Sequence, residues 1–131
     1  MPRMPKTILI VDDEKNVRFS ISVALRMSGY RVVEAANGIE ALDLIRASRQ
    51  KGDEIALLLL DIKMPLMNGL VLLDRLHEEN LCIPVLISTG YGDREITEEL
   101  VRRGCGDFME KPFEPSDMIA KVNGILGRTR Q

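Results

Sequence analysis

The chain has 131 residues, of which 45% are hydrophobic and 29% are charged, and its formal net charge is −2. This length and balance are typical of one globular domain with a substantial core, and the small negative charge offers no basic surface for direct nucleic-acid binding. The apolar runs are too short to cross a membrane, and the apolar part of the N-terminal segment is too short for a secretory signal, so we expect a cytoplasmic protein.

The first half of the chain alternates short apolar runs with longer helical patterns. Residues 7–11 (TILIV) are an apolar run of strand length, and residues 14–30 follow as a helix that ends at Gly29. Residues 31–36 alternate as in a strand with one less buried side, and residues 37–52 form a second helical pattern. The apolar side chains of that pattern recur at helical spacing: Ile39, Leu42 and Ile45.

The same alternation continues through the second half. Further strands are predicted at residues 55–60, 83–88 and 107–111, and further helices at residues 69–80, 93–104 and 114–127. Strands that alternate with helices pair in parallel, and right-handed crossovers put helices on both faces of the sheet. The sequence therefore predicts a doubly wound α/β domain of five βα units. In such a sheet, ligands bind outside the carboxyl ends of the strands.

Four of the five predicted strands end in residues that carry chemistry. The residues are Asp12 and Asp13 after the first strand, Asp61 after the third, Ser88 and Thr89 at the fourth, and Lys111 after the fifth. Carboxylates gathered at one edge repel one another unless a cation lies between them, and oxygen ligands of this kind suit Mg²⁺. A lysine beside them supplies a mobile positive charge for a phosphoryl group. Taken singly, Asp12 and Asp13 could be helix caps and Asp61 a turn residue, but their joint position favours a reactive site.

Four segments, in this order, resemble the receiver domain of two-component response regulators. They are VDDE (11–14), LLLLDIKMPLMNGL (57–70), PVLISTGYGD (84–93) and DFMEKPF (107–113). The resemblance covers residues 6–127. It implies a flavodoxin-like (βα)5 fold with a parallel sheet in the order 2-1-3-4-5, and one receiver domain over residues 1–131 with no output domain in this chain.

The resemblance also implies roles for individual residues. Asp61 would be the phosphoacceptor, and Lys111, followed by a cis peptide bond to Pro112, would pair with the phosphoryl oxygens. Thr89 would follow the phosphoryl group, and Phe108 would turn inward when Thr89 moves. The implied Mg²⁺ ligands are Asp12, Asp13, Asp61 and the backbone carbonyl of Lys63.

The implied function is that of a signalling switch. A histidine kinase or a phosphotransfer protein would donate the phosphoryl group, and the surface of the fourth helix, fifth strand and fifth helix would control an effector or an output domain. The chain would catalyse only its own phosphotransfer and autodephosphorylation, and phosphorylation is expected to allow a homodimer. A stand-alone regulator and the receiver part of a longer regulator or hybrid kinase both remain open.

Three alternatives share parts of this pattern. A flavodoxin-type FMN carrier has the same fold class, but its phosphate would meet Asp12, Asp13 and Glu14 in the first loop. An aspartyl phosphatase usually carries a second Asp two residues after the nucleophile, where this chain has Lys63. A receiver that acts only as an interaction module would not need the acid pair, the acceptor, the hydroxyl and the lysine together.

Overall fold

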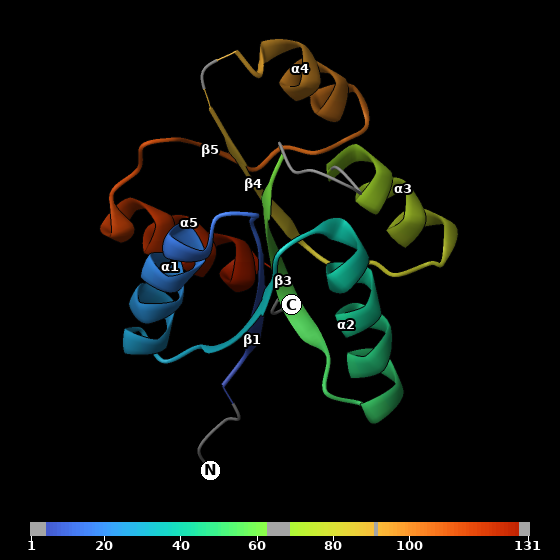
Figure 1. Cartoon of the computed structure of the whole chain (residues 1–131), viewed down its shortest axis with the longest axis vertical. Helices are drawn as coiled ribbons and strands as arrows, with labels where there is room; N and C mark the ends of the chain where they lie inside the picture. Colours follow the sequence, from blue (N-terminus) through green and yellow to red (C-terminus); the bar gives the residue numbers. More distant parts are fainter. Residues whose placement is uncertain (1–4, 63–68, 91, 129–131) are drawn as a thin grey trace.

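The computed structural model describes residues 5–62, 69–90 and 92–128, and strands and helices alternate within these ranges as predicted (Figure 1). No helix in the described ranges is long and apolar enough to span a bilayer. The strands are β1 (Thr7–Val11), β2 (Arg31–Ala35), β3 (Ile55–Asp61), β4 (Val85–Thr89) and β5 (Phe108–Glu110). The helices are α1 (Lys15–Met27), α2 (Gly38–Lys51), α3 (Gly69–Glu78), α4 (Arg94–Arg102) and α5 (Pro115–Arg128).

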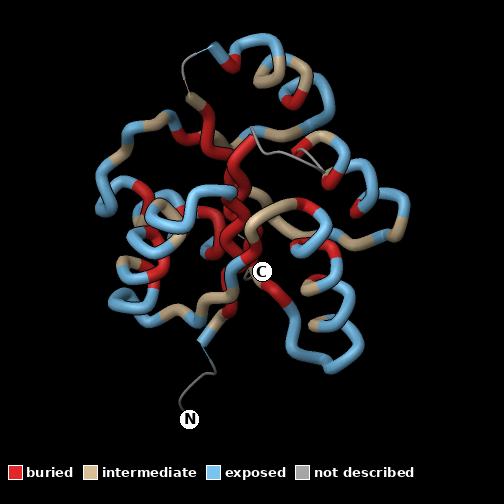
Figure 2. Tube along the Cα trace, in the orientation of Figure 1, coloured by how far each residue is buried: buried red, intermediate tan, exposed pale blue. Residues whose placement is uncertain are grey.

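The strands form one parallel sheet in the order β2-β1-β3-β4-β5, which confirms the predicted topology. The central strands β1 and β3 are almost entirely buried, as Figure 2 shows, and this explains their continuous apolar sequences. The expected strand with one less buried side agrees with β2, where the side of Val32 and Glu34 has no buried residue. As an edge strand, β2 leaves Arg31 and Glu34 exposed and has only Ala35 buried.

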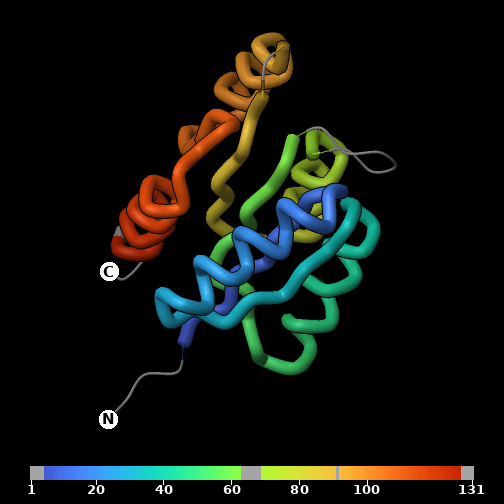
Figure 3. The backbone as a smooth tube through the Cα atoms, turned by 60° about the vertical axis from the view of Figure 1, so that its left-hand side comes forward, coloured from blue at the N-terminus to red at the C-terminus, as the bar shows by residue number. Residues whose placement is uncertain are grey.

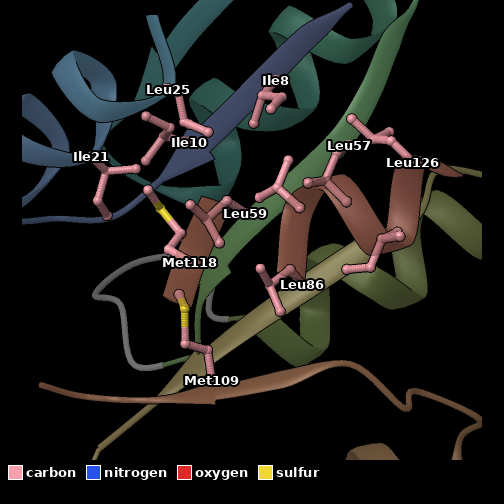
Figure 4. Packing of buried hydrophobic residues seen from close by; sticks show 12 residues of the cluster. Ile8, Ile10, Ile21, Leu25, Leu57, Leu59, Leu86, Met109, Met118 and Leu126 are labelled. Atoms are coloured by element: carbon pink, nitrogen blue, oxygen red, sulfur yellow. The ribbon is translucent and has the colours of Figure 1, made fainter. Parts of the chain in front are cut away.

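Helices cover both faces of the sheet, because successive side chains of a strand point to opposite sides. On one face, side chains of β1, β3 and β4 pack against α1 and α5 (Figure 4): Ile8, Ile10, Leu57, Leu59 and Leu86 meet Ile21, Leu25, Met118 and Leu126. On the other face the intervening side chains pack against α2 and α3: Leu9, Val11, Leu58 and Leu60 meet Leu42, Ile45, Leu72 and Leu76. Two apolar layers therefore hold β3 rigidly.

Local sequence signals set several element boundaries. The side chain of Asn37 accepts a hydrogen bond from the backbone N–H of Glu40 at 2.9 Å, which caps the start of α2. Gly52 ends the same helix in the left-handed conformation, with φ of 74°. Ile39 does not join the core as its spacing suggested, because its position in the first turn of α2 leaves it 48% exposed.

Helix α4 is held more lightly than the other layers and lies at one end of the molecule, next to β5 (Figures 1 and 3). Among its residues, all of which are described, only Leu100 is buried. Leu100 packs with Ile62 and Ile87 in a small third apolar cluster. An ion pair between Arg103, just after α4, and Asp74 on α3 adds an exposed contact. A helix with so few buried contacts opens at a lower free energy than elements that are buried in the core.

Candidate functional site

The predicted residues meet at the carboxyl edge of the sheet. Asp12 directly follows β1, Asp61 is the last residue of β3, Thr89 is the last residue of β4 and Lys111 directly follows β5. The parallel register brings these ends together, since Asp61 pairs with Ser88 and Thr89 pairs with Glu110. Residues far apart in the sequence are thus delivered to one place by the strand order.

Three carboxylates form the centre of this edge. One oxygen from each of Asp12, Asp13 and Asp61 lies within 4.8 Å of the others. Asp12 and Asp61 are buried, whereas Asp13 is exposed, so the cluster opens to solvent on one side. A set of carboxylate oxygens this compact fits a hard divalent cation such as Mg²⁺, which binds one or two carboxylates and keeps several waters.

Lys111 supplies positive charge beside the cluster. Its ammonium group lies 3.2 Å from an oxygen of Asp61 and 3.4 Å from an oxygen of Asp12. Partial burial lowers the pKa of Lys111, but the charges of Asp61 and Asp12 and its hydrogen bonds to both raise it more, so the net pKa lies above its ordinary value. The lysine therefore stays protonated at neutral pH and bridges two of the three acids.

The backbone N–H, the backbone carbonyl and both side-chain oxygens of Asp12 all take part in hydrogen bonds. Its backbone N–H donates to the carbonyl of Ala35 at 3.2 Å, and one side-chain oxygen accepts from the N–H of Glu14 at 2.9 Å. The other side-chain oxygen faces Lys111, and the backbone carbonyl accepts from Nη1 of Arg18 at 2.6 Å. Because of these contacts, the turn between β1 and α1 presents its acids in one defined arrangement.

The contact of Arg18 was missed in the sequence. A signal was present, since Arg18 lies in the first turn of α1, where a positive charge opposes the helix dipole. Its Nε donates to the carboxylate of Glu34 on β2 at 3.2 Å. The partner could not be inferred, because Glu34 is distant in the sequence.

The other residues predicted for the site are Thr89, Phe108, Pro112 and Lys63. Thr89 is buried at the end of β4, and Phe108 is half-buried against the cluster of Ile62, Ile87 and Leu100. The peptide bond between Lys111 and Pro112 is cis, as the resemblance implied. Lys63, the predicted carbonyl ligand, lies outside the described residues.

The chain was also compared with known proteins. The family model "Response regulator receiver domain" matches residues 8–123. The phosphate regulon transcriptional regulatory protein PhoB of Pseudomonas aeruginosa is 38% identical over 126 residues, covering 95% of this chain and 53% of PhoB. The alkaline phosphatase synthesis transcriptional regulatory protein PhoP of Bacillus subtilis is 36% identical, covering 96% of this chain and 50% of PhoP.

Solved structures agree with these relatives. The crystal structure of a CheY-like response regulator receiver domain protein from Methanospirillum hungatei superposes with a TM-score of 0.83 at 31% identity, covering 95% of this chain and 96% of that one. The chain spans about half the length of the curated relatives that it matches.

Proposed function

Because the chain belongs to the response regulator receiver domain family of two-component systems, we propose that Asp61 accepts a phosphoryl group from a histidine kinase or a phosphotransfer protein. One observation carries this proposal: buried Asp61 lies within 4.8 Å of two further carboxylates and 3.2 Å from the ammonium of Lys111. Membership of this family makes the chain a signalling domain. The acid cluster is the group of side chains that could accept a phosphoryl group.

In the proposed reaction, a carboxylate oxygen of Asp61 attacks the phosphorus of a phosphohistidine. A P–O bond forms as the P–N bond breaks, and the bonding electrons leave with the imidazole nitrogen. Mg²⁺, held by Asp12, Asp13, Asp61 and the carbonyl of Lys63, would neutralise charge on the phosphoryl oxygens. Lys111 contributes a second positive charge and orients the group. Asp61 becomes an acyl phosphate, which water later hydrolyses.

We further propose that phosphorylation changes the surface made by α4, β5 and α5. Thr89 would move toward the phosphoryl group so that its hydroxyl donates a hydrogen bond to it. The movement of Thr89 would open space for Phe108 to turn inward. Two observations support a displaceable surface here: α4 buries only Leu100, and Phe108 already packs against the same small cluster. The surface would then bias binding of a partner between two states.

We propose that residues 6–127 make up one receiver domain that acts in the cytoplasm on an output domain or a separate effector. Its chemistry would be confined to its own phosphotransfer and autodephosphorylation, and phosphorylation would allow a homodimer. The rival functions fit the site less well. A flavin phosphate would face Asp12 and Asp13, and the sequence has Lys63 where an aspartyl phosphatase usually has a second Asp.

The test is the intact mass of the protein after incubation with Mg²⁺ and acetyl phosphate. We expect the wild type to gain one phosphoryl group, and we expect EDTA or Asp61→Asn to abolish the gain. Asp74→Asn serves as a control, because Asp74 lies on α3 outside the acid cluster. Absence of the gain in the wild type would contradict phosphoacceptor function, and a gain that survives Asp61→Asn would identify a different acceptor.

A further inference from the structure

We infer that Arg18 is a positioning residue for the cation site. Its guanidinium, anchored by Glu34, holds the backbone carbonyl of Asp12 and thereby sets the arrangement of the Asp12–Asp13 pair. This inference rests on the proposed function, since it concerns the cation that the acids would bind. It adds a residue that touches neither the cation nor the phosphoryl group.

The geometry ties two elements together through one side chain. Arg18 donates from Nη1 to the carbonyl of Asp12 at 2.6 Å and from Nε to Glu34 at 3.2 Å. The Arg18 side chain is only 14% exposed, against 37% for Glu34, so most of the arginine side chain is removed from water. Glu34 pairs with Ile10 of β1 in the parallel register, and this fixes the anchor relative to the strand that leads into the site.

The backbone of Asp12 is consequently tied to β2 at both its N–H and its carbonyl, directly at the first and through Arg18 at the second. Its N–H donates to the carbonyl of Ala35, and its carbonyl accepts from the arginine that Glu34 anchors. Asp13 depends on the second of these contacts, because the carbonyl of Asp12 belongs to the peptide unit that links Asp12 to Asp13. Groups that orient metal ligands typically change affinity about 10-fold to 100-fold when they are removed. Loss of the Arg18 contact should therefore disturb the positions of both Asp12 and Asp13.

The positive charge of Arg18, taken alone, would affect Mg²⁺ affinity in the direction opposite to its positioning of the acids. A guanidinium near three carboxylates lowers the negative potential that attracts a cation, so an arginine that acted only by charge would weaken cation binding. Positioning predicts that removal of Arg18 weakens binding, whereas a pure charge effect predicts that removal tightens it. The sign of the change therefore separates the two.

The experiment measures Mg²⁺ affinity by calorimetry in the wild type, Arg18→Met and Arg18→Lys. Lysine keeps the charge but lacks the planar fork that bonds two acceptors at once. Arg26 provides matched controls, because it lies on the same helix and donates to the carbonyl of Val32 on β2 at 3.2 Å, away from the acids. Thermal unfolding in EDTA checks that all variants, including Arg26→Met and Arg26→Lys, remain folded.

We expect Arg18→Met to raise the Mg²⁺ dissociation constant by about tenfold, Arg18→Lys to raise it by a smaller factor, and both Arg26 variants to leave it unchanged. In acetyl phosphate reactions, the Mg²⁺ concentration for half-maximal rate should shift by the same factors, while the rate at saturating Mg²⁺ stays near that of the wild type.

Unchanged or tighter Mg²⁺ binding by Arg18→Met would overturn the inference and leave the proposed function standing, provided that the wild type is phosphorylated. An equal loss in the Arg26 variants would also overturn it, because the effect would then belong to the helix as a whole. A wild type that binds no Mg²⁺ would overturn both this inference and the proposed function.

Discussion

Replacing the proposed phosphoacceptor should make the cation-free protein more stable. Asp61 is a buried carboxylate next to two others, with Lys111 as a shared counter-charge. Asp61→Asn keeps the size of the side chain and removes the charge. We expect its free energy of unfolding in EDTA at neutral pH to exceed that of the wild type by about 1–2 kcal/mol, because the site is arranged to bind a cation rather than to stabilise the empty fold.

Three contributions from the described residues oppose one another: attraction to Lys111, repulsion from the other two acids, and the cost of burial. Attraction between Asp61 and Lys111 at 3.2 Å is about 5 kcal/mol at an effective dielectric constant of about 20. Repulsion from Asp12, at up to 4.8 Å, is about 3.5 kcal/mol on the same basis, and exposed Asp13 adds a smaller, solvent-screened repulsion. These charge effects nearly cancel. The cost of burying the Asp61 carboxylate, which is 8% exposed, then decides the sign, because the neutral amide largely avoids it.

Thermal and urea unfolding measure the effect directly. In EDTA the melting temperature of Asp61→Asn should rise by roughly 3–8 °C, and saturating Mg²⁺ should stabilise the wild type more than the variant. Asp74→Asn, which removes an exposed ion pair with Arg103, should show neither change. If Asp61→Asn were instead less stable than the wild type in EDTA, the ion pair with Lys111 would outweigh repulsion and burial, and the reasoning would be refuted.

Three further predictions concern the lysine, the core and a helix cap. Because the pKa of Lys111 is raised in the folded state, its contribution to folding stability is complete below the unfolded pKa of about 10.5 and is lost as pH rises through the folded pKa. In urea unfolding titrations at increasing alkaline pH, the stability advantage of the wild type over Lys111→Gln should therefore shrink. Leu58→Ala should cost about 3 kcal/mol of unfolding free energy, because Leu58 is fully buried; a cost below about 1 kcal/mol would contradict its core role. Asn37→Ala should cost about 1 kcal/mol through loss of the α2 cap, and Asn37→Ser should restore most of it.

The order of elements could be predicted from the sequence because it depends on local patterns. Apolar runs of strand length, helical spacing and terminal glycines such as Gly52 are properties of neighbouring residues. Parallel pairing and the handedness of crossovers then constrain where strand ends meet. Small errors occurred where a neighbour decides the outcome. β4 begins at Val85 rather than at residue 83, because Pro84 has no N–H to donate. The carbonyl of Pro84 still accepts a hydrogen bond from the N–H of Leu58.

The sequence by itself therefore determined which residues reach the carboxyl edge, since Asp12, Asp61, Thr89 and Lys111 each directly follow or end a strand. Only the tertiary structure decided how they are held. The bond from Arg18 to Asp12, its anchor on Glu34 and the light attachment of α4 through Leu100 depend on contacts between separate elements. Local periodicity carries no information about such contacts, because it reports which face of an element is apolar and not which polar atoms meet across it.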